Sequence, residues 1–170
     1  MDEVLAVQSS LTKNFVKADS MRLFLDFDGV LHPFFYRHSN KAFCYVPRLE
    51  AVLKDFPAVQ IIITGMHTAK MPLARLTRNF SPDIAKRIIG STPLLPLHST
   101  EDIRESRYRE IQTYLRNSYG PWLALDDEAD LFPPGCPQLI LCEDGFRQRE
   151  EAALRTALVG AEHALCGLPR

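Results

Sequence analysis

The sequence lacks the features of a membrane protein, a disulfide-stapled domain or a zinc protein. Its 170 residues include four cysteines, none in a C-x-x-C pair or beside histidines at zinc-finger spacing. No apolar run is long enough to cross a membrane, and residues 1–20 lack the apolar core of a signal peptide. We therefore expect reduced thiols in a cytoplasmic protein that has no membrane partner.

The charge shows no excess of either sign, with 20 basic and 21 acidic residues and a net charge of −1. Bulk electrostatic attraction to nucleic acid is therefore not expected. Nucleic acid stays open as a partner through a local patch, because several basic residues cluster between Arg75 and Arg87. No repeat is present, and the length suits one domain at 21–170 after a leader or helix at 1–20.

Five short apolar runs alternate with helical patterns along the chain. In a parallel sheet that is covered on both faces, each strand appears in the sequence as a continuous apolar run of this kind. The alternation predicts an α/β fold, a Rossmann-like three-layer sandwich around a five-stranded, mainly parallel sheet. The predicted strands are 22–27, 59–63, 87–89, 122–125 and 138–142, and the predicted helices are 47–56, 72–80, 100–117 and 146–165.

The first strand ends in two acids separated by one residue, followed by glycine. Residues two apart on a strand point to the same side, so Asp26 and Asp28 can face one bound group as the chain turns at Gly29. One carboxylate can then attack while the other handles protons. A D-x-D pair alone would favour a solvated Asp-Gly turn, but the whole string hhhhDxDGVL is much more specific.

Two other predicted strands also end in polar residues. Thr64 and Gly65 follow one of them and offer a hydroxyl and an N–H to phosphoryl oxygens, although a helix cap or turn is the alternative. Asp126 and Asp127 follow another, and adjacent acids repel unless a cation such as Mg²⁺ lies between them. Asp130 is a further acid, which we interpret as part of an exposed turn. Because ligands bind at the carboxyl ends of parallel strands, these residues predict one site.

These three motifs resemble those of the haloacid dehalogenase (HAD) superfamily of phosphatases. The resemblance implies that Asp26 is the nucleophile and forms an aspartyl-phosphate, while Asp28 protonates the leaving group and then activates water. It implies that Thr64 binds phosphoryl oxygens. It also implies a Mg²⁺ cofactor held by Asp26, Asp28, Asp126 and Asp127, with Asp28 contributing its main-chain carbonyl.

The superfamily also uses a Lys or Arg to neutralise the nucleophile and the phosphate. Arg107 is the candidate, because it lies four residues from both Ile103 and Ile111 and so on the predicted inward stripe of helix 100–117. An arginine on such a stripe usually has an anionic partner, although an arginine that reaches to the surface is the alternative. The other arginines of this helix are Arg104, Arg109 and Arg116.

A narrower likeness is to the HAD-like domain of bacterial RNA-repair proteins. It is carried by D-G-V-L-H-P at 28–33, I-G-S-T-P at 89–93, R-x-x-E-I at 107–111 and L-D-D at 125–127. The chain departs from that group after the second strand, where T-G-M-H-T replaces a Ser-rich stretch with Trp-Arg, so the likeness does not imply a shared substrate. His32 and His67 are candidates for substrate binding with Gly65, although a loop histidine is more often incidental.

The distance between the motifs leaves no room for a large cap domain. Only 36 positions separate Asp28 from Thr64, and the predicted helix uses ten of them, so residues 31–46 can form an aromatic flap. An open site suits a large substrate, such as a nucleic-acid end or a phosphoprotein. We expect a Mg²⁺-dependent phosphomonoester hydrolase, and the alternatives are a phosphotransferase or a non-catalytic regulatory or binding module on the same fold.

Overall fold

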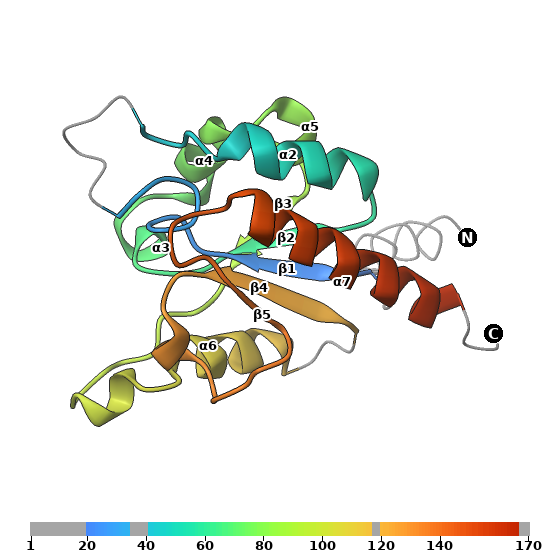
Figure 1. The fold of residues 1–170 in the computed structure, drawn as a ribbon. Helices are drawn as coiled ribbons and strands as arrows, with labels where there is room; N and C mark the ends of the chain where they lie inside the picture. The colour runs from blue at the N-terminus through green and yellow to red at the C-terminus, as the bar shows by residue number, and fades with distance from the viewer. Residues whose placement is uncertain (1–19, 35–40, 117–119, 167–170) are drawn as a thin grey trace, which may run out of the picture.

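The computed structural model describes residues 20–34, 41–116 and 120–166. The leader or helix expected at 1–20 therefore lies almost wholly outside the described residues. No helix in the described part is long and apolar enough to cross a membrane. The fold is built on a sheet in which every strand pair is parallel, in the order β3-β2-β1-β4-β5 (Figure 1). The strands are β1 (Arg22–Leu25), β2 (Gln60–Ile63), β3 (Ile88–Ser91), β4 (Trp122–Asp126) and β5 (Leu139–Leu141).

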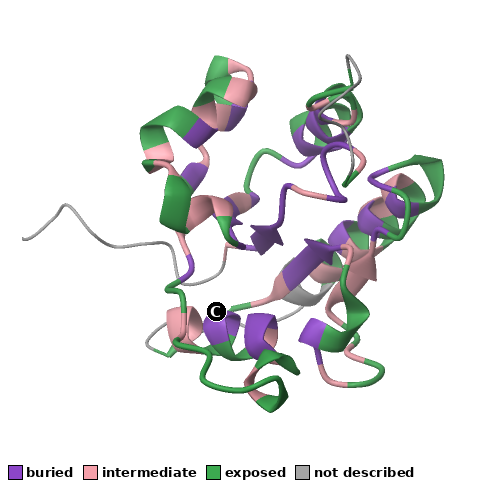
Figure 2. Ribbon diagram, turned by 90° about the vertical axis from the view of Figure 1, so that its left-hand side faces the viewer, coloured by how far each residue is buried: buried purple, intermediate pink, exposed green. Residues whose placement is uncertain are grey.

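Helices cover both faces of this sheet, as the apolar strands predicted. Side chains alternate along β1, so Leu23 and Leu25 belong to one core cluster and Phe24 to the other. The first cluster is closed by α2 (Val46–Asp55) and α7 (Gln148–Cys166), and the second by α6 (Ser106–Leu115). Figure 2 shows the buried segments gathered in the central strands and on the inward sides of the helices. The three-layer α/β architecture is confirmed.

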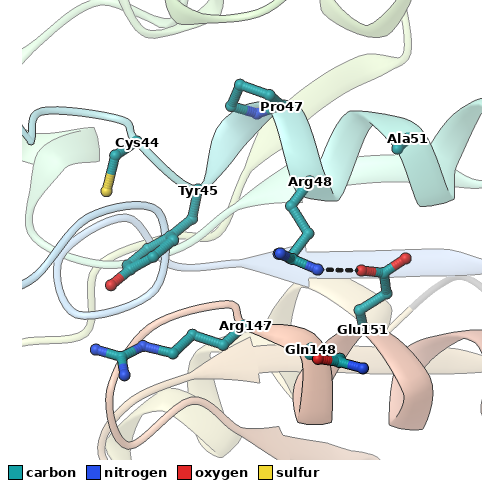
Figure 3. A pocket seen from close by; sticks show the side chains of 8 residues that line it. All are labelled: Cys44, Tyr45, Pro47, Arg48, Ala51, Arg147, Gln148 and Glu151. Atoms are coloured by element: carbon teal, nitrogen blue, oxygen red, sulfur yellow. Dashed lines mark hydrogen bonds and ion pairs between the residues drawn. The ribbon is translucent and has the colours of Figure 1, made fainter.

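The helix predicted at 47–56 is present as α2 and packs beside α7. Proline in its first turn suits a helix start, and Leu49, Val52 and Leu53 form its buried stripe. Arg48 of α2 donates to Glu151 of α7 at 2.6 Å, which Figure 3 shows as a link between the two helices. An exposed ion pair of this kind contributes little stability, so the apolar stripe holds the helix in place.

The register of the sheet aligns the carboxyl ends of its three central strands. Leu25 of β1 pairs with the last residue of β2 on one side and with Leu125 of β4 on the other. Asp26, Thr64 and Asp126 therefore leave the sheet side by side. The strand order also reverses direction at β1, and ligands bind at such switch points in open parallel sheets.

The helix predicted at 100–117 is interrupted, which corrects one argument from the sequence. A 3₁₀ turn at Glu101–Ile103 is followed by Glu105 in the left-handed region (φ 57°), and only then does α6 begin. Ile103 is 45% exposed, so it does not belong to an inward stripe, whereas Ile111 is fully buried. The inward face of α6 is instead marked by its buried residues, which are Ser106, Arg107, Glu110 and Ile111.

Short turns of helix replace the single helix predicted at 72–80. Prolines at 72 and 82 each lack a backbone donor and fix φ, so they start new turns more readily than they continue old ones. Two of these turns were not predicted, because four residues are too few to show a helical period. The segments are α3 (His67–Lys70), α4 (Leu73–Leu76), η1 (Thr77–Asn79) and α5 (Pro82–Ala85).

The connections at the carboxyl edge of the sheet are loops and short helices, without a large cap domain. Between β1 and β2, the described residues 26–34 and 41–59 contain one helix of ten residues, α2. Phe43 and Tyr45 from the predicted aromatic flap pack against the core, while Phe34 is exposed. The prediction of a HAD-like domain without a large cap agrees with this architecture.

Candidate active site

Asp26 lies at the carboxyl end of the central strand, where the candidate active site is built. Its backbone N–H continues the sheet by donating to Leu125, and its side chain is buried. The Nη2 atom of Arg107 lies 3.9 Å from Asp26 Oδ1, which makes an ion pair. The sequence led us to expect this contact, although the argument through Ile103 was wrong.

Arg107, a residue of α6, contacts three acidic side chains. Besides Asp26, its Nε donates to Asp126 Oδ2 at 2.9 Å and its Nη1 donates to Glu110 Oε2 at 3.2 Å. Burial by itself would lower the pKa of Arg107, but these carboxylates together raise it. The guanidinium is thus fully charged, and its fork geometry fits several oxygens at once. Arg109, in contrast, donates to main-chain carbonyls at the helix start and is turned away.

Asp26, Asp126 and Asp127 form a cluster in which one carboxylate oxygen from each residue lies within 4.8 Å of the other two. Burial, followed by the charge of Asp126, raises the pKa of Asp26 well above its usual range, and Arg107 only partly offsets this. Burial and Asp126 also raise the pKa of Asp127 to about 6. Carboxylates held together against their repulsion fit a cation, which would favour their charged forms.

Asp126 differs from the other two acids of the cluster, because both of its carboxylate oxygens accept hydrogen bonds. Both oxygens of Asp126 accept bonds, one from Arg107 and the other from the N–H of Glu128 at 3.1 Å. Asp127 faces Gly29, where a Cβ would collide with its Oδ2. Asp26 and Asp127 are therefore best placed to offer oxygens to a metal ion, and Asp126 fixes Arg107.

Asp130 does not join the acidic cluster. Its residue is exposed, one 3₁₀ turn beyond β4, as expected for a solvated acid. The cluster is formed by other residues in the part of the chain that the structure describes.

Thr64 and Gly65 bring the chain from β2 close to Asp26. Thr64 is buried and donates its N–H to the carbonyl of Leu25 at 2.9 Å. Gly65 has φ +87°, and a Cβ there would collide with Asp26 Oδ1 and lie 3.3 Å from Arg107 Nη2. A side chain at position 65 would thus fill the space beside the predicted nucleophile, and glycine keeps that space open.

Asp28 turns towards two histidines and away from the acidic cluster. His67 Nε2 lies 2.9 Å from Asp28 Oδ2, and His32 Nε2 lies 3.7 Å from Oδ1. His32 is fully buried against Phe43, and burial lowers its pKa, while the nearby Asp28 partly offsets this. The metal contact expected from Asp28 is therefore left to its main chain, and the substrate contacts expected from both histidines stay predictions.

The family of the chain follows from a comparison with known protein families. The family described as "HAD domain in Swiss Army Knife RNA repair proteins" matches residues 22–150. The chain belongs to this family. The matched range contains all five strands and every residue of the site described above. No curated protein and no solved structure matches the chain.

Membership in this HAD family points to hydrolase chemistry of the phosphoesterase type. HAD domains generally use Mg²⁺, and the buried acidic cluster of this chain fits a divalent cation. The roles of the individual site residues stay predictions.

Glu110 belongs to the HAD site, although we predicted no role for it from the sequence. It is buried, pairs with Arg107 three residues earlier, and accepts from the N–H of Leu95 at 3.4 Å. Burial raises its pKa, and Arg107 partly offsets this. A signal was present, because an acid at i+3 from an inward arginine on one helix face can pair with it. Glu110 orients the guanidinium towards Asp26 and Asp126.

A separate open groove of about 820 Å³ lies where α2 meets α7 (Figure 3). Its most prominent groups are Tyr45, Arg147 and the Arg48–Glu151 pair, and the Arg147 guanidinium lies 5.9 Å from the centre of the Tyr45 ring. No residue of the acidic cluster lines this groove. The acidic cluster of the HAD domain therefore lies at the strand ends and not in this groove.

Proposed function

We propose that this HAD domain is a Mg²⁺-dependent phosphomonoester hydrolase that acts through an aspartyl-phosphate on Asp26. One observation carries the proposal: Asp26 lies against Arg107 and within the acidic cluster, with open space at Gly65 beside its Oδ1. A carboxylate nucleophile, a fixed cation and room for a phosphoryl group are the parts that phosphoryl transfer requires.

In the first step, a carboxylate oxygen of Asp26 forms a bond to phosphorus. The bond between phosphorus and the leaving oxygen breaks, and its electron pair stays with that oxygen. Asp28, as a carboxylic acid, donates the proton that the leaving oxygen takes up, and becomes a carboxylate. The buried Arg107 stabilises negative charge on the phosphoryl oxygens, and Thr64 and Gly65 donate hydrogen bonds to them.

In the second step, the Asp28 carboxylate removes a proton from water while the water oxygen bonds to phosphorus. The bond between phosphorus and Asp26 then breaks, and its electrons return to the Asp26 carboxylate. Inorganic phosphate is released, and both acids regain their starting states. An acceptor other than water would turn the same sequence of bonds into phosphotransfer.

Bound Mg²⁺ would offset the repulsion between the anionic nucleophile and the anionic phosphate. Asp26 and Asp127 would hold it through side-chain oxygens, and Asp28 through its main-chain carbonyl. Asp126 contributes by holding Arg107 at 2.9 Å, which keeps the guanidinium beside the nucleophile.

The substrate that we favour is the phosphorylated end of an RNA. The family takes its description from RNA repair proteins, and the site lacks a large cap that would exclude a polymer. The balanced charge of the chain indicates that binding depends on the site itself more than on long-range attraction.

The proposed function is tested with an aryl phosphate in the presence of Mg²⁺ or EDTA. We expect hydrolysis with Mg²⁺, none with EDTA, and none from Asp26→Asn, because the amide is a poor nucleophile of nearly the same shape. Asp130→Asn, which alters an exposed acid near the same strand end, should match the wild type. Full activity after rigorous metal removal, or in Asp26→Asn, would contradict the proposal.

The substrate class is tested separately by comparing kcat/KM across phosphorylated compounds. RNA oligonucleotides phosphorylated at either end should exceed nucleotides, sugar phosphates and phosphopeptides. Preference for a phosphopeptide or for a sugar phosphate would overturn the RNA assignment and leave the hydrolytic mechanism in place.

A further inference from the structure

His67 is held in place by the backbone turn that follows β2. Gly65 turns the chain with its positive φ, and its carbonyl accepts from the N–H of Thr68 at 3.1 Å and from the Thr68 hydroxyl at 2.8 Å. The carbonyl of His67 accepts from Met71 at 3.0 Å. The backbone that carries the imidazole is therefore held by hydrogen bonds on both sides of His67.

The His67 ring has one polar partner in the described part of the chain, and that partner is Asp28. His67 Nε2 lies 2.9 Å from Asp28 Oδ2, while Nδ1 is buried without a hydrogen bond. The ring also packs on Phe27, with centroids 5.5 Å apart. In the tautomer with hydrogen on Nε2, the ring donates to Oδ2 of Asp28, and Oδ2 can accept this bond whether or not Oδ1 carries a proton.

The hydrogen bond with His67 is the shortest contact that a side chain makes with the Asp28 carboxyl group in the described part of the chain. Its side chain is 39% exposed, compared with 16% for His67, and it does not belong to the acidic cluster. His32 Nε2 lies 3.7 Å from Oδ1, beyond hydrogen-bonding distance. Without His67, the partly exposed carboxyl group would lose this hydrogen bond and keep only the longer ion pair with His32.

We propose that His67 is a positioning residue that holds Asp28 in the orientation required for proton transfer. Its Nε2–H fixes Oδ2, which leaves Oδ1 to carry the proton that the leaving oxygen takes up as the phosphorus–oxygen bond breaks. This inference rests on the proposed function, and it gives His67 a different role from the substrate contact expected from the sequence.

The test uses the leaving group, because only poor leaving groups need a proton as they depart. We compare kcat/KM for an alkyl phosphate and for dinitrophenyl phosphate in wild type, His67→Ala, His67→Gln and the exposed control His98→Ala. General acid catalysis contributes about 100-fold or more, so His67→Ala should lose roughly 10- to 100-fold on the alkyl ester and less than about threefold on the dinitrophenyl ester. His98→Ala should match wild type on both.

His67→Gln separates hydrogen bonding from other roles. Its side-chain amide can donate from nearly the position of Nε2, so it should restore most of the rate on the alkyl phosphate. Failure of this rescue, an equal loss on both esters in His67→Ala, or a change in KM alone would overturn the positioning role. Thermal unfolding of each variant shows whether the fold is kept.

The measurements on wild type and His67→Ala separate an error in the role of His67 from an error in the proposed function. A wild-type protein that hydrolyses neither ester with Mg²⁺ contradicts the proposed hydrolase and the positioning role together. A wild-type protein that is active, with His67→Ala equally active on both esters, contradicts only the role of His67.

Discussion

Replacing Arg107 with alanine is the perturbation whose consequences the structure defines most fully. The guanidinium lies 3.9 Å from Asp26, 2.9 Å from Asp126 and 3.2 Å from Glu110, and all of these side chains are buried. Removing one partner of a buried ion pair typically costs about 3–5 kcal/mol of unfolding free energy. The loss of a fixed donor to the phosphoryl group should also lower kcat by roughly 100- to 1,000-fold.

The pH dependence of this stability loss follows from the carboxylates that remain. Burial already raises the pKa of Asp26, Asp126 and Glu110, and without Arg107 these pKa values rise further. A carboxyl group whose pKa is raised in the folded protein makes its full contribution to stability below its pKa in the unfolded chain. That contribution is lost as pH rises through its pKa in the folded protein. The deficit of Arg107→Ala should therefore be small near pH 4, about the unfolded pKa of these acids, and grow towards neutrality.

The assay combines urea unfolding across this pH range with kcat/KM for an aryl phosphate. Arg104→Ala is the matched control, because Arg104 is an exposed arginine three residues away, and its stability should change by less than about 0.5 kcal/mol. Arg107→Lys keeps one charge but cannot reach three carboxylates, so it should lie between the two. Wild-type activity in Arg107→Ala, or a stability loss that does not vary with pH, would refute the reasoning.

Three further predictions concern the metal and the glycine at the site. Mg²⁺ at about 100 times its Kd should add about 2.7 kcal/mol of stability, which is a rise in Tm of roughly 5–11 °C for a chain of this size. This rise should shrink below about pH 6, where Asp127 becomes protonated, and a thermal scan without any shift would contradict the metal site. Asp127→Asn should weaken Mg²⁺ binding measured by calorimetry, and equal binding would remove Asp127 from the ligands. Gly65→Ala should abolish hydrolysis and cost about 1–3 kcal/mol in urea unfolding, since its Cβ meets Asp26 at an unfavourable φ; an active variant would contradict the geometry.

The sheet could be predicted because each of its buried strands forms a recognisable apolar run in the sequence. Buried parallel strands are apolar along their whole length, and each predicted run contains or overlaps one of the five observed strands. The approach of Asp26, Thr64 and Asp126 follows from the same pattern, because parallel strands in register end at one edge of the sheet. These features depend on local sequence and on a general property of the fold.

The contacts that orient the site could not be predicted from local patterns. His67 meets Asp28 across 39 positions of sequence, through a turn that depends on the positive φ of Gly65. No proline or glycine lies near the interruption at Glu105, so the sequence predicted one continuous helix over 100–117. The division of roles between Asp126 and Asp127 depends on which oxygens are already hydrogen-bonded, which only the folded arrangement defines.

The most direct test of the account is to look for the phosphoryl group on Asp26 during turnover. Wild-type protein is mixed with Mg²⁺ and excess aryl phosphate, quenched in acid within the first turnovers, and digested for mass spectrometry. The account predicts at most one phosphoryl group per chain, carried by the peptide that contains Asp26 and absent from Asp26→Asn. Turnover without any phosphorylated protein, or with the phosphoryl group on another residue, would contradict it.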